Sequence, residues 1–168
     1  MIKIVLIVFS VIFMSCGAIR NKEPEVVIKT KEKCSIQMVN GWYEHYFHDQ
    51  LNFKPLGLQS NKTINYLTIY VTETELSIYD FIKKQNESKK TYYNKLKVEV
   101  EKKQTSNGEC FIEYSIMTSG KNLSKRLVHF YKYKNTLFAV GYNMEEKHYD
   151  TYIDDAKKMM NSFKIVKK

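Results

Sequence analysis

Residues 126–142 read Arg-Leu-Val-His-Phe-Tyr-Lys-Tyr-Lys-Asn-Thr-Leu-Phe-Ala-Val-Gly-Tyr. Two apolar and aromatic runs, 126–133 and 136–142, are separated only by Lys134 and Asn135. A break of two residues between such runs is typical of a tight β-hairpin. Apolar residues occupy both faces of these strands, which is the pattern of a sheet that is covered on both sides. The sequence therefore predicts an antiparallel hairpin inside a packed sheet.

Two amphipathic helices are predicted, one before and one after this hairpin. The later helix follows a cap signal at 143–146 and repeats apolar residues at spacings of three and four from Tyr149 to Phe163. The earlier helix is expected from Leu76 to about Lys90, after a Thr-Glu-Thr-Glu capping box at 72–75. Its buried stripe is expected to be Ile78, Phe81 and Ile82.

The remaining strands are short and separated by turn signals. They are predicted within residues 35–47, on either side of Asn40-Gly41, and at 64–71, 95–103 and 109–118. Residues 163–166 are expected to form either a last short strand or a packed tail. The order is strands, helix, antiparallel strands, helix, so the predicted fold class is α+β, an antiparallel β-sheet flanked by two helices. The length of 168 residues favours one domain.

The N-terminus has the pattern of an export signal. Lys3 precedes an apolar run from Ile4 to Met14, which is too short for a comfortable membrane-spanning helix. The run ends at Phe13-Met-Ser-Cys16, which resembles the lipobox of bacterial lipoproteins, although Phe13 replaces the usual leucine. This resemblance implies cleavage before Cys16 and lipidation of its thiol. The alternative is an N-terminal anchor that is not cleaved.

Three segments follow from this signal. Residues 1–15 are predicted to be the lipoprotein signal peptide, and residues 34–168 a single α+β domain. Residues 16–33 alternate charges of both signs, so they are expected to form a flexible tether after the lipidated Cys16. Two or three acyl chains would hold the domain firmly at a bacterial membrane, facing the periplasm or the cell surface.

The basic charge has the composition of a solvated surface. The net charge is +9, and it comes from lysines spread along the chain, with Arg20 and Arg126 as the arginines. Nucleic-acid sites usually depend on arginine forks, so no nucleic-acid partner is expected.

The pattern resembles the PsbP/Mog1-like α/β sandwich family, which includes bacterial lipoproteins. The features that carry this likeness are Gly41-Trp42, the Leu67–Val71 strand running into the 76–81 helix, the 133–138 hairpin, and the ending Tyr152…Ala156…Met160-Asn-Ser162-Phe163. They extend over residues 35–166. The better known members of this family are accessory or interaction proteins without catalysis, so the resemblance implies the fold and a non-enzymatic role.

Cysteine and histidine are the candidates for site chemistry. Cys34 and Cys110 form an even pair, which is open to two readings, a disulfide or two free thiols. His45 and His48, with Asp49 beside them, are weak candidates for a metal site, because a strand points residues three apart to opposite sides. No catalytic residue, no cofactor and no other metal site are predicted.

Aromatic residues are enriched, with 13 Tyr, 9 Phe and 1 Trp. Five of them are candidates for an exposed binding face on the sheet: Trp42, Tyr43, Tyr131, Tyr133 and Tyr142. The pattern favours the other interpretation, in which they fill and border the core.

These patterns together predict a lipid-anchored, non-enzymatic lipoprotein of the cell envelope that binds a protein or an envelope polymer. Two alternatives stay open. One is a small envelope hydrolase or metal-dependent enzyme, and the other is an immunity-type or structural lipoprotein.

Overall fold

The computed structural model describes residues 24–28, 33–47, 50–58 and 65–166. The described residues contain two helices, α1 (Ile78–Lys89) and α2 (Glu146–Ser162). The strands in chain order are β1 (Glu25–Ile28), β2 (Cys34–Gln37), β3 (Trp42–Phe47), β4 (Gln50–Pro55), β5 (Tyr66–Glu73), β6 (Lys95–Thr105), β7 (Gly108–Ser119), β8 (Asn122–Tyr133), β9 (Thr136–Glu145) and β10 (Lys164–Ile165).

A seven-stranded antiparallel sheet organises the molecule, in the order β3-β4-β5-β9-β8-β7-β6. The predicted hairpin is confirmed as β8–β9, which pair from Tyr133–Thr136 outward. Lys134 in its turn has φ 53°, the left-handed conformation that a two-residue hairpin requires. β9 pairs with β5 on its other side, so the hairpin lies inside the sheet, as its apolar character on both faces requires.

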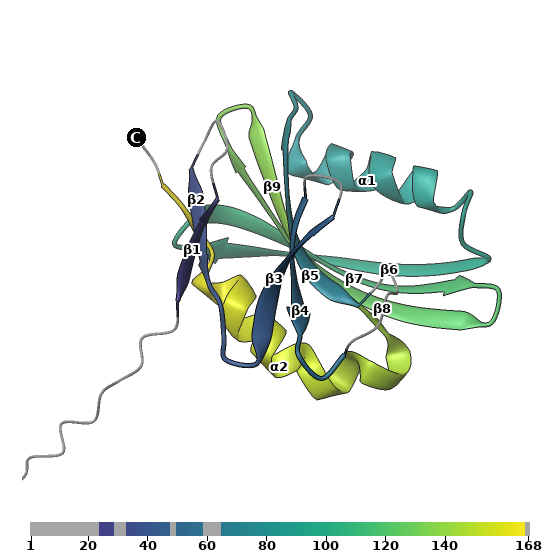
Figure 1. Cartoon of the computed structure of the whole chain (residues 1–168). Coiled ribbons are helices and arrows are strands. Elements are labelled where there is room, and N and C mark those ends of the chain that lie inside the picture. The colour runs from purple at the N-terminus through teal and green to yellow at the C-terminus, as the bar shows by residue number, and fades with distance from the viewer. Residues whose placement is uncertain (1–23, 29–32, 48–49, 59–64, 167–168) are drawn as a thin grey trace, which may run out of the picture.

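The two helices lie on opposite sides of this sheet (Figure 1), so the predicted α+β sandwich is confirmed. Strand alternation sends neighbouring residues of β8 and β9 to opposite faces. On the α1 side, Ile78 and Ile82 of the helix pack on four buried sheet residues, and Phe81 and Phe111 border the cluster. The buried sheet residues are Val128, Phe130, Leu137 and Ala139.

The larger core lies on the α2 side. There Ala156, Met159 and Met160 of α2 pack against the sheet and against a second, three-stranded sheet, β1-β2-β10. β10 pairs with β2 directly after α2 ends, so the segment forms the short strand that was one of its two expected forms. Phe163 stacks on Tyr131 with a ring-centroid distance of 5.4 Å, and this contact closes the core at that end.

The second sheet corrects the predicted tether. Residues 25–28 lie inside the expected flexible segment 16–33, yet they form β1 and pair with β2 from Glu25–Gln37 to Ile28–Cys34. The three consecutive branched apolar residues Val26-Val-Ile28 suit an edge strand. The folded part therefore begins by residue 25, not at Cys34.

Helix starts also differ from the predicted caps. The hydroxyl of Ser77 accepts the Asp80 amide at 3.1 Å, so Ser77 is the N-cap of α1 and the capping box at 72–75 is wrong. The cap signal at 143–146 predicted the right position, because α2 begins at Glu146 with Glu145 as its N-cap, but the Glu145 side chain makes no capping hydrogen bond.

The predicted signal peptide and Cys16 lie outside the described residues. Among the described residues, no helix has the length and apolar character that crossing a bilayer requires.

Candidate functional site

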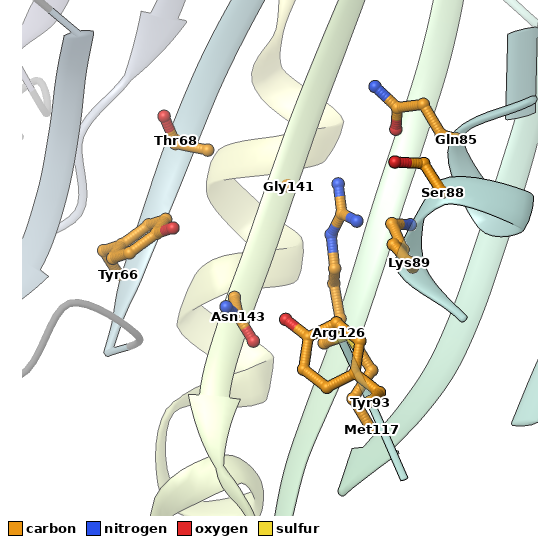
Figure 2. Close-up of a pocket in the computed structure, with 10 residues that line it drawn as sticks. All are labelled: Tyr66, Thr68, Gln85, Ser88, Lys89, Tyr93, Met117, Arg126, Gly141 and Asn143. Atoms are coloured by element: carbon orange, nitrogen blue, oxygen red, sulfur yellow. The ribbon is translucent and has the colours of Figure 1, made fainter. Parts of the chain in front are cut away.

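A polar cavity of about 410 Å³ lies between the end of α1 and the sheet. The helix covers only part of this face, and the cavity opens where α1 ends. Figure 2 shows Arg126 of β8 standing between β9 and Lys89 of α1. The lining residues are Tyr66, Thr68, Gln85, Ser88, Lys89, Tyr93, Met117, Arg126, Gly141 and Asn143. Its floor is open at Gly141, which has no side chain.

A buried carboxylate organises the charges at this site. Glu113 of β7 has no exposed side chain and lies beneath the end of α1. The Lys89 ammonium donates to its Oε1 at 3.0 Å, and Ser115 Oγ donates to the same oxygen at 3.2 Å. Asn86 Nδ2 donates to the other oxygen, Oε2, at 3.3 Å. These contacts hold Lys89 and Glu113 in one arrangement.

Arg126 takes part in this cluster from a greater distance. Its Nη1 lies 3.8 Å from Glu113 Oε1, beyond hydrogen-bonding range, and 21% of its side chain is exposed. Alternation in β8 places it on the same face as Val128, so its guanidinium faces α1. Arg126 therefore presents its hydrogen-bonding fork to the cavity while Lys89 pairs with the carboxylate.

Desolvation changes the acidity of Lys89. Burial lowers the pKa of Lys89 to about 8, the Arg126 charge acts in the same direction, and the Glu113 carboxylate opposes both. The ammonium is still charged at pH 7. Two cations and one carboxylate then leave the cluster with one net positive charge.

Asn143 adds an acceptor without a partner. Its Oδ1 is buried and makes no hydrogen bond with the described residues. Asn143 lies opposite Arg126 in the β8–β9 register, so the two side chains are neighbours on one face. The cavity thus combines a cationic donor with a buried acceptor.

The sequence interpretation missed this site. Glu113 alternates with Ile112 and Tyr114, which is the pattern of a residue that faces water. Arg126 offered the one local signal, because arginine is rare in this lysine-rich chain.

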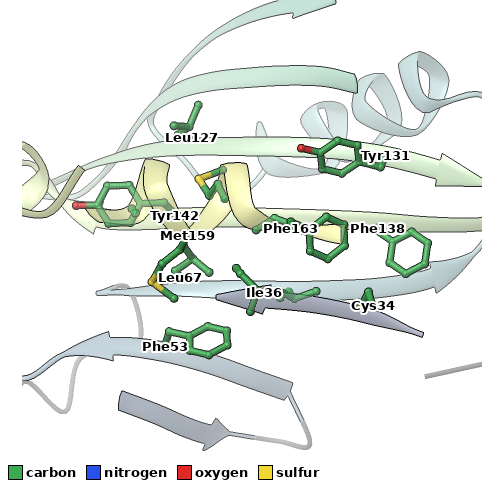
Figure 3. Close-up of a cluster of buried hydrophobic side chains, with 14 of the residues drawn as sticks. Cys34, Ile36, Phe53, Leu67, Leu127, Tyr131, Phe138, Tyr142, Met159 and Phe163 are labelled. Carbon is green, nitrogen blue, oxygen red and sulfur yellow. The ribbon is translucent and has the colours of Figure 1, made fainter. Parts of the chain in front are cut away.

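The candidate aromatic face is wrong and the core interpretation is confirmed for most of the five residues, because they are buried. Trp42, Tyr131 and Tyr142 are 5%, 3% and 0% exposed, and they belong to the α2-side cluster. Figure 3 shows Tyr131 and Tyr142 among the core side chains. Tyr43 and Tyr133 are half-buried, and Tyr133 packs against the same cluster. α2 packs on these strands, as the core interpretation of the aromatic residues requires.

The exposed tyrosines are different residues from separate elements. They are Tyr46 of β3, Tyr70 of β5, Tyr79 of α1, Tyr92 after α1 and Tyr114 of β7.

Both cysteines of the domain are buried free thiols in the structure, so the disulfide is not formed. Cys34 lies in β2 of the small sheet and Cys110 in β7 of the large sheet. Burial raises the pKa of each thiol to about 11, so neither is a thiolate at neutral pH.

The histidine pair is not brought together within the described residues. His45 is half-buried in β3, and its ring meets Tyr43 edge-on at 6.5 Å. His48 and Asp49 lie outside the described residues. The part of the chain that the structure describes holds no cluster of three His, Cys, Asp or Glu side chains suited to a metal.

Comparisons with known proteins support the fold. No protein-family model and no curated protein sequence matches the chain. The chain is similar in structure to cyanobacterial PsbP (CyanoP) from Synechocystis sp. PCC 6803, with a TM-score of 0.59 and 15% sequence identity. The match covers 92% of this chain and 99% of the cyanobacterial one. At this identity the likeness establishes a PsbP-like fold.

Proposed function

We propose that this chain is a lipid-anchored, non-enzymatic binding domain of the cell envelope, and that the cavity beneath the end of α1 is its ligand site. The non-enzymatic role follows from the family resemblance, which the PsbP-like fold supports. The anchor follows from the lipobox-like Phe13-Met-Ser-Cys16.

One observation carries the choice of site, the charged cluster around Glu113. A carboxylate with a fully buried side chain requires fixed partners, because leaving it unpaired would cost several kcal/mol. Here the partners are two cations, which is one more than the carboxylate neutralises. Burying the extra charge does not help folding. An excess cation held in a cavity of about 410 Å³ instead suits the capture of a ligand.

The ligand site is tested by nuclear magnetic resonance on the isotope-labelled full chain in detergent micelles. The probes are propionate, N-acetylalanine, inorganic phosphate, ethylammonium and glucose, each titrated separately. We expect at least one probe to give saturable shifts centred on Arg126, Gly141 and Asn143. Saturable shifts elsewhere, or none with any probe, would overturn this choice of site.

The anchor is tested by expressing the full chain and its Cys16→Ser variant in a bacterium. We expect the wild-type protein in the membrane fraction, with a new N-terminus at Cys16 and the added mass of acyl chains. The variant is expected to lack that mass. An unmodified Cys16 in a full-length wild-type chain would contradict the lipid anchor and favour an uncleaved N-terminal segment.

A further inference from the structure

The charge of the cavity selects the charge of its ligand. Lys89 and Arg126 together carry two positive charges, and Glu113 returns one negative charge. A monoanion would bring the cluster to neutrality in a partly desolvated site. A dianion such as phosphate would leave an uncompensated negative charge, which is costly where water is scarce.

The geometry of Arg126 favours a planar anion. Lys89 is engaged at 3.0 Å with Glu113, whereas the ion pair of Arg126 with Glu113 spans 3.8 Å. The guanidinium therefore keeps donors for a ligand. Its planar fork matches the two oxygens of a carboxylate, which it binds with paired hydrogen bonds.

Asn143 requires a hydrogen-bond donor, which the same ligand would have to supply. Its Oδ1 is buried and unpaired among the described residues, and a buried acceptor without a donor costs about 1–3 kcal/mol. Because Asn143 and Arg126 are cross-strand partners, a group that satisfies both must carry an anion and a donor close together.

We propose that the cavity binds a carboxylate that has an N–H donor within a few bonds, the chemistry shared by N-acylated amino acids and the free C-terminus of a peptide. Arg126 holds the carboxylate, and Asn143 accepts the N–H. The open floor at Gly141 leaves room for the rest of the ligand. This inference rests on the proposed function, because it names the ligand class of that cavity.

The test compares matched probes on the full chain in micelles, by calorimetry and by the resonances of Arg126 and Asn143. N-acetylalanine carries both features, propionate lacks the N–H, and N-acetylalaninamide lacks the charge. We expect N-acetylalanine to bind at least about 10-fold more tightly than either, the effect of losing one strong hydrogen bond in a binding site.

A second pair of probes distinguishes the two sources of the carboxylate. Acetylated trialanine with a free C-terminus is compared with the same peptide in its amidated form. Tighter binding of the free peptide than of N-acetylalanine indicates a peptide C-terminus, and weaker binding indicates a single acylated amino acid. Either order supports the carboxylate, provided that the amidated peptide does not bind.

Three variants link binding to the cavity. Arg126→Gln is expected to weaken N-acetylalanine binding about 10-fold or more. Gly141→Ala places a methyl group on the floor of the cavity. The added Cβ would lie 3.5 Å from Val128 Cγ2, which is an ordinary contact, so the variant keeps the fold and reduces the space in the cavity. Lys84→Gln removes an exposed charge from the same helix outside the cavity and is the control, with unchanged binding.

Two results separate this inference from the proposed function. If phosphate, glucose or ethylammonium saturates the cavity and N-acetylalanine does not, the carboxylate is wrong and the ligand site stands. If no probe reaches the cavity, both are wrong. Equal affinity for propionate and N-acetylalanine would overturn the role of Asn143.

Discussion

Glu113 shows how a single residue sets the character of the candidate site. Its carboxylate lies beneath α1 and receives hydrogen bonds from Lys89, Asn86 and Ser115. A buried ion pair contributes little net stability, because desolvation opposes the attraction, yet removing one partner leaves the other charge stranded. The cluster therefore fixes the geometry of the cavity more than it stabilises the fold.

Replacing the Glu113 carboxylate should lower the free energy of unfolding, and the size of this loss should depend on Lys89. We expect Glu113→Gln to lower the free energy of unfolding by about 3 kcal/mol, the low end for a broken buried pair, because Lys89 retains some contact with water. Adding Lys89→Met should restore a large part of that loss, because no stranded ammonium remains. Chemical denaturation at pH 7 measures both. A double variant as unstable as the single one would contradict this account.

His129 should make stability sensitive to mild acid. Burial lowers the pKa of His129 to about 4, Lys103 acts in the same direction, and Glu101 opposes them. The unfolded chain, with a pKa near 6.5, therefore takes up the proton first as the pH falls. The contribution of neutral His129 to the free energy of unfolding is complete above about pH 6.5 and is lost as the pH falls towards 4. Between pH 7 and pH 5 the free energy of unfolding should fall by about 2 kcal/mol from this residue.

The variant His129→Gln isolates this contribution. Glutamine does not titrate, and its side-chain amide can donate or accept in place of His129 Nδ1, which lies within hydrogen-bonding distance of Tyr131 Oη at 3.3 Å. Urea midpoints should then fall less steeply from pH 7 to pH 5 than those of the wild-type chain. Parallel profiles for the two proteins would rule out His129 as the source.

At the scale of elements, α1 matters because it carries three cavity residues, Gln85, Ser88 and Lys89. Its start is fixed by Ser77, whose Oγ accepts the Asp80 amide at 3.1 Å and donates to Asp80 Oδ2 at 2.6 Å. We expect Ser77→Ala to cost about 1 kcal/mol. Glu75→Ala removes the acidic member of the capping box that the sequence suggested, and because this residue is exposed and lies outside the strands and helices, the change should cost much less. Denaturation midpoints of the two variants provide the comparison, and equal losses would refute the cap assignment.

Local patterns predicted the elements that carry a strong periodicity. The β8–β9 hairpin and α2 were predicted because their apolar residues repeat at the spacing of a strand or a helix. β4 was missed because Gln50–Pro55 is short, contains Asn52 and Lys54, and ends in proline, so it lacks the composition of a strand. β1 was missed because its three apolar residues are surrounded by charges.

The candidate site could not be predicted from local sequence patterns, for a different reason. It is formed by α1, β5, β7, β8 and β9, and the sheet order that brings these together is a tertiary property. Glu113 is buried because the end of α1 covers it, and nothing in its own strand indicates that. The aromatic residues stayed open to two interpretations, because the sequence alone does not tell which face of the sheet α2 covers.

The whole molecule is two cores that share one sheet. The α2-side core extends from the small sheet to Tyr142, and the α1-side core is smaller and rests on Ile78 and Ile82. β8 and β9 supply buried residues to both. Separating α1 from the sheet would expose four buried sheet residues to water, Val128, Phe130, Leu137 and Ala139. This exposure is unfavourable, so the unfolding of α1 is coupled to the unfolding of the central strands.

The two cores should therefore unfold together. Trp42, the one tryptophan of the chain, is buried on the α2 side and meets Tyr152 edge-on at 6.3 Å, so its fluorescence reports the larger core. Ile82→Ala, in the opposite core, should cost about 2–5 kcal/mol. If the sheet couples the layers, this variant shifts the Trp42 transition and the helical circular dichroism transition by the same amount. A dichroism transition that comes first, with Trp42 unmoved, would mean that α1 separates alone and that the cavity it covers opens without unfolding of the domain.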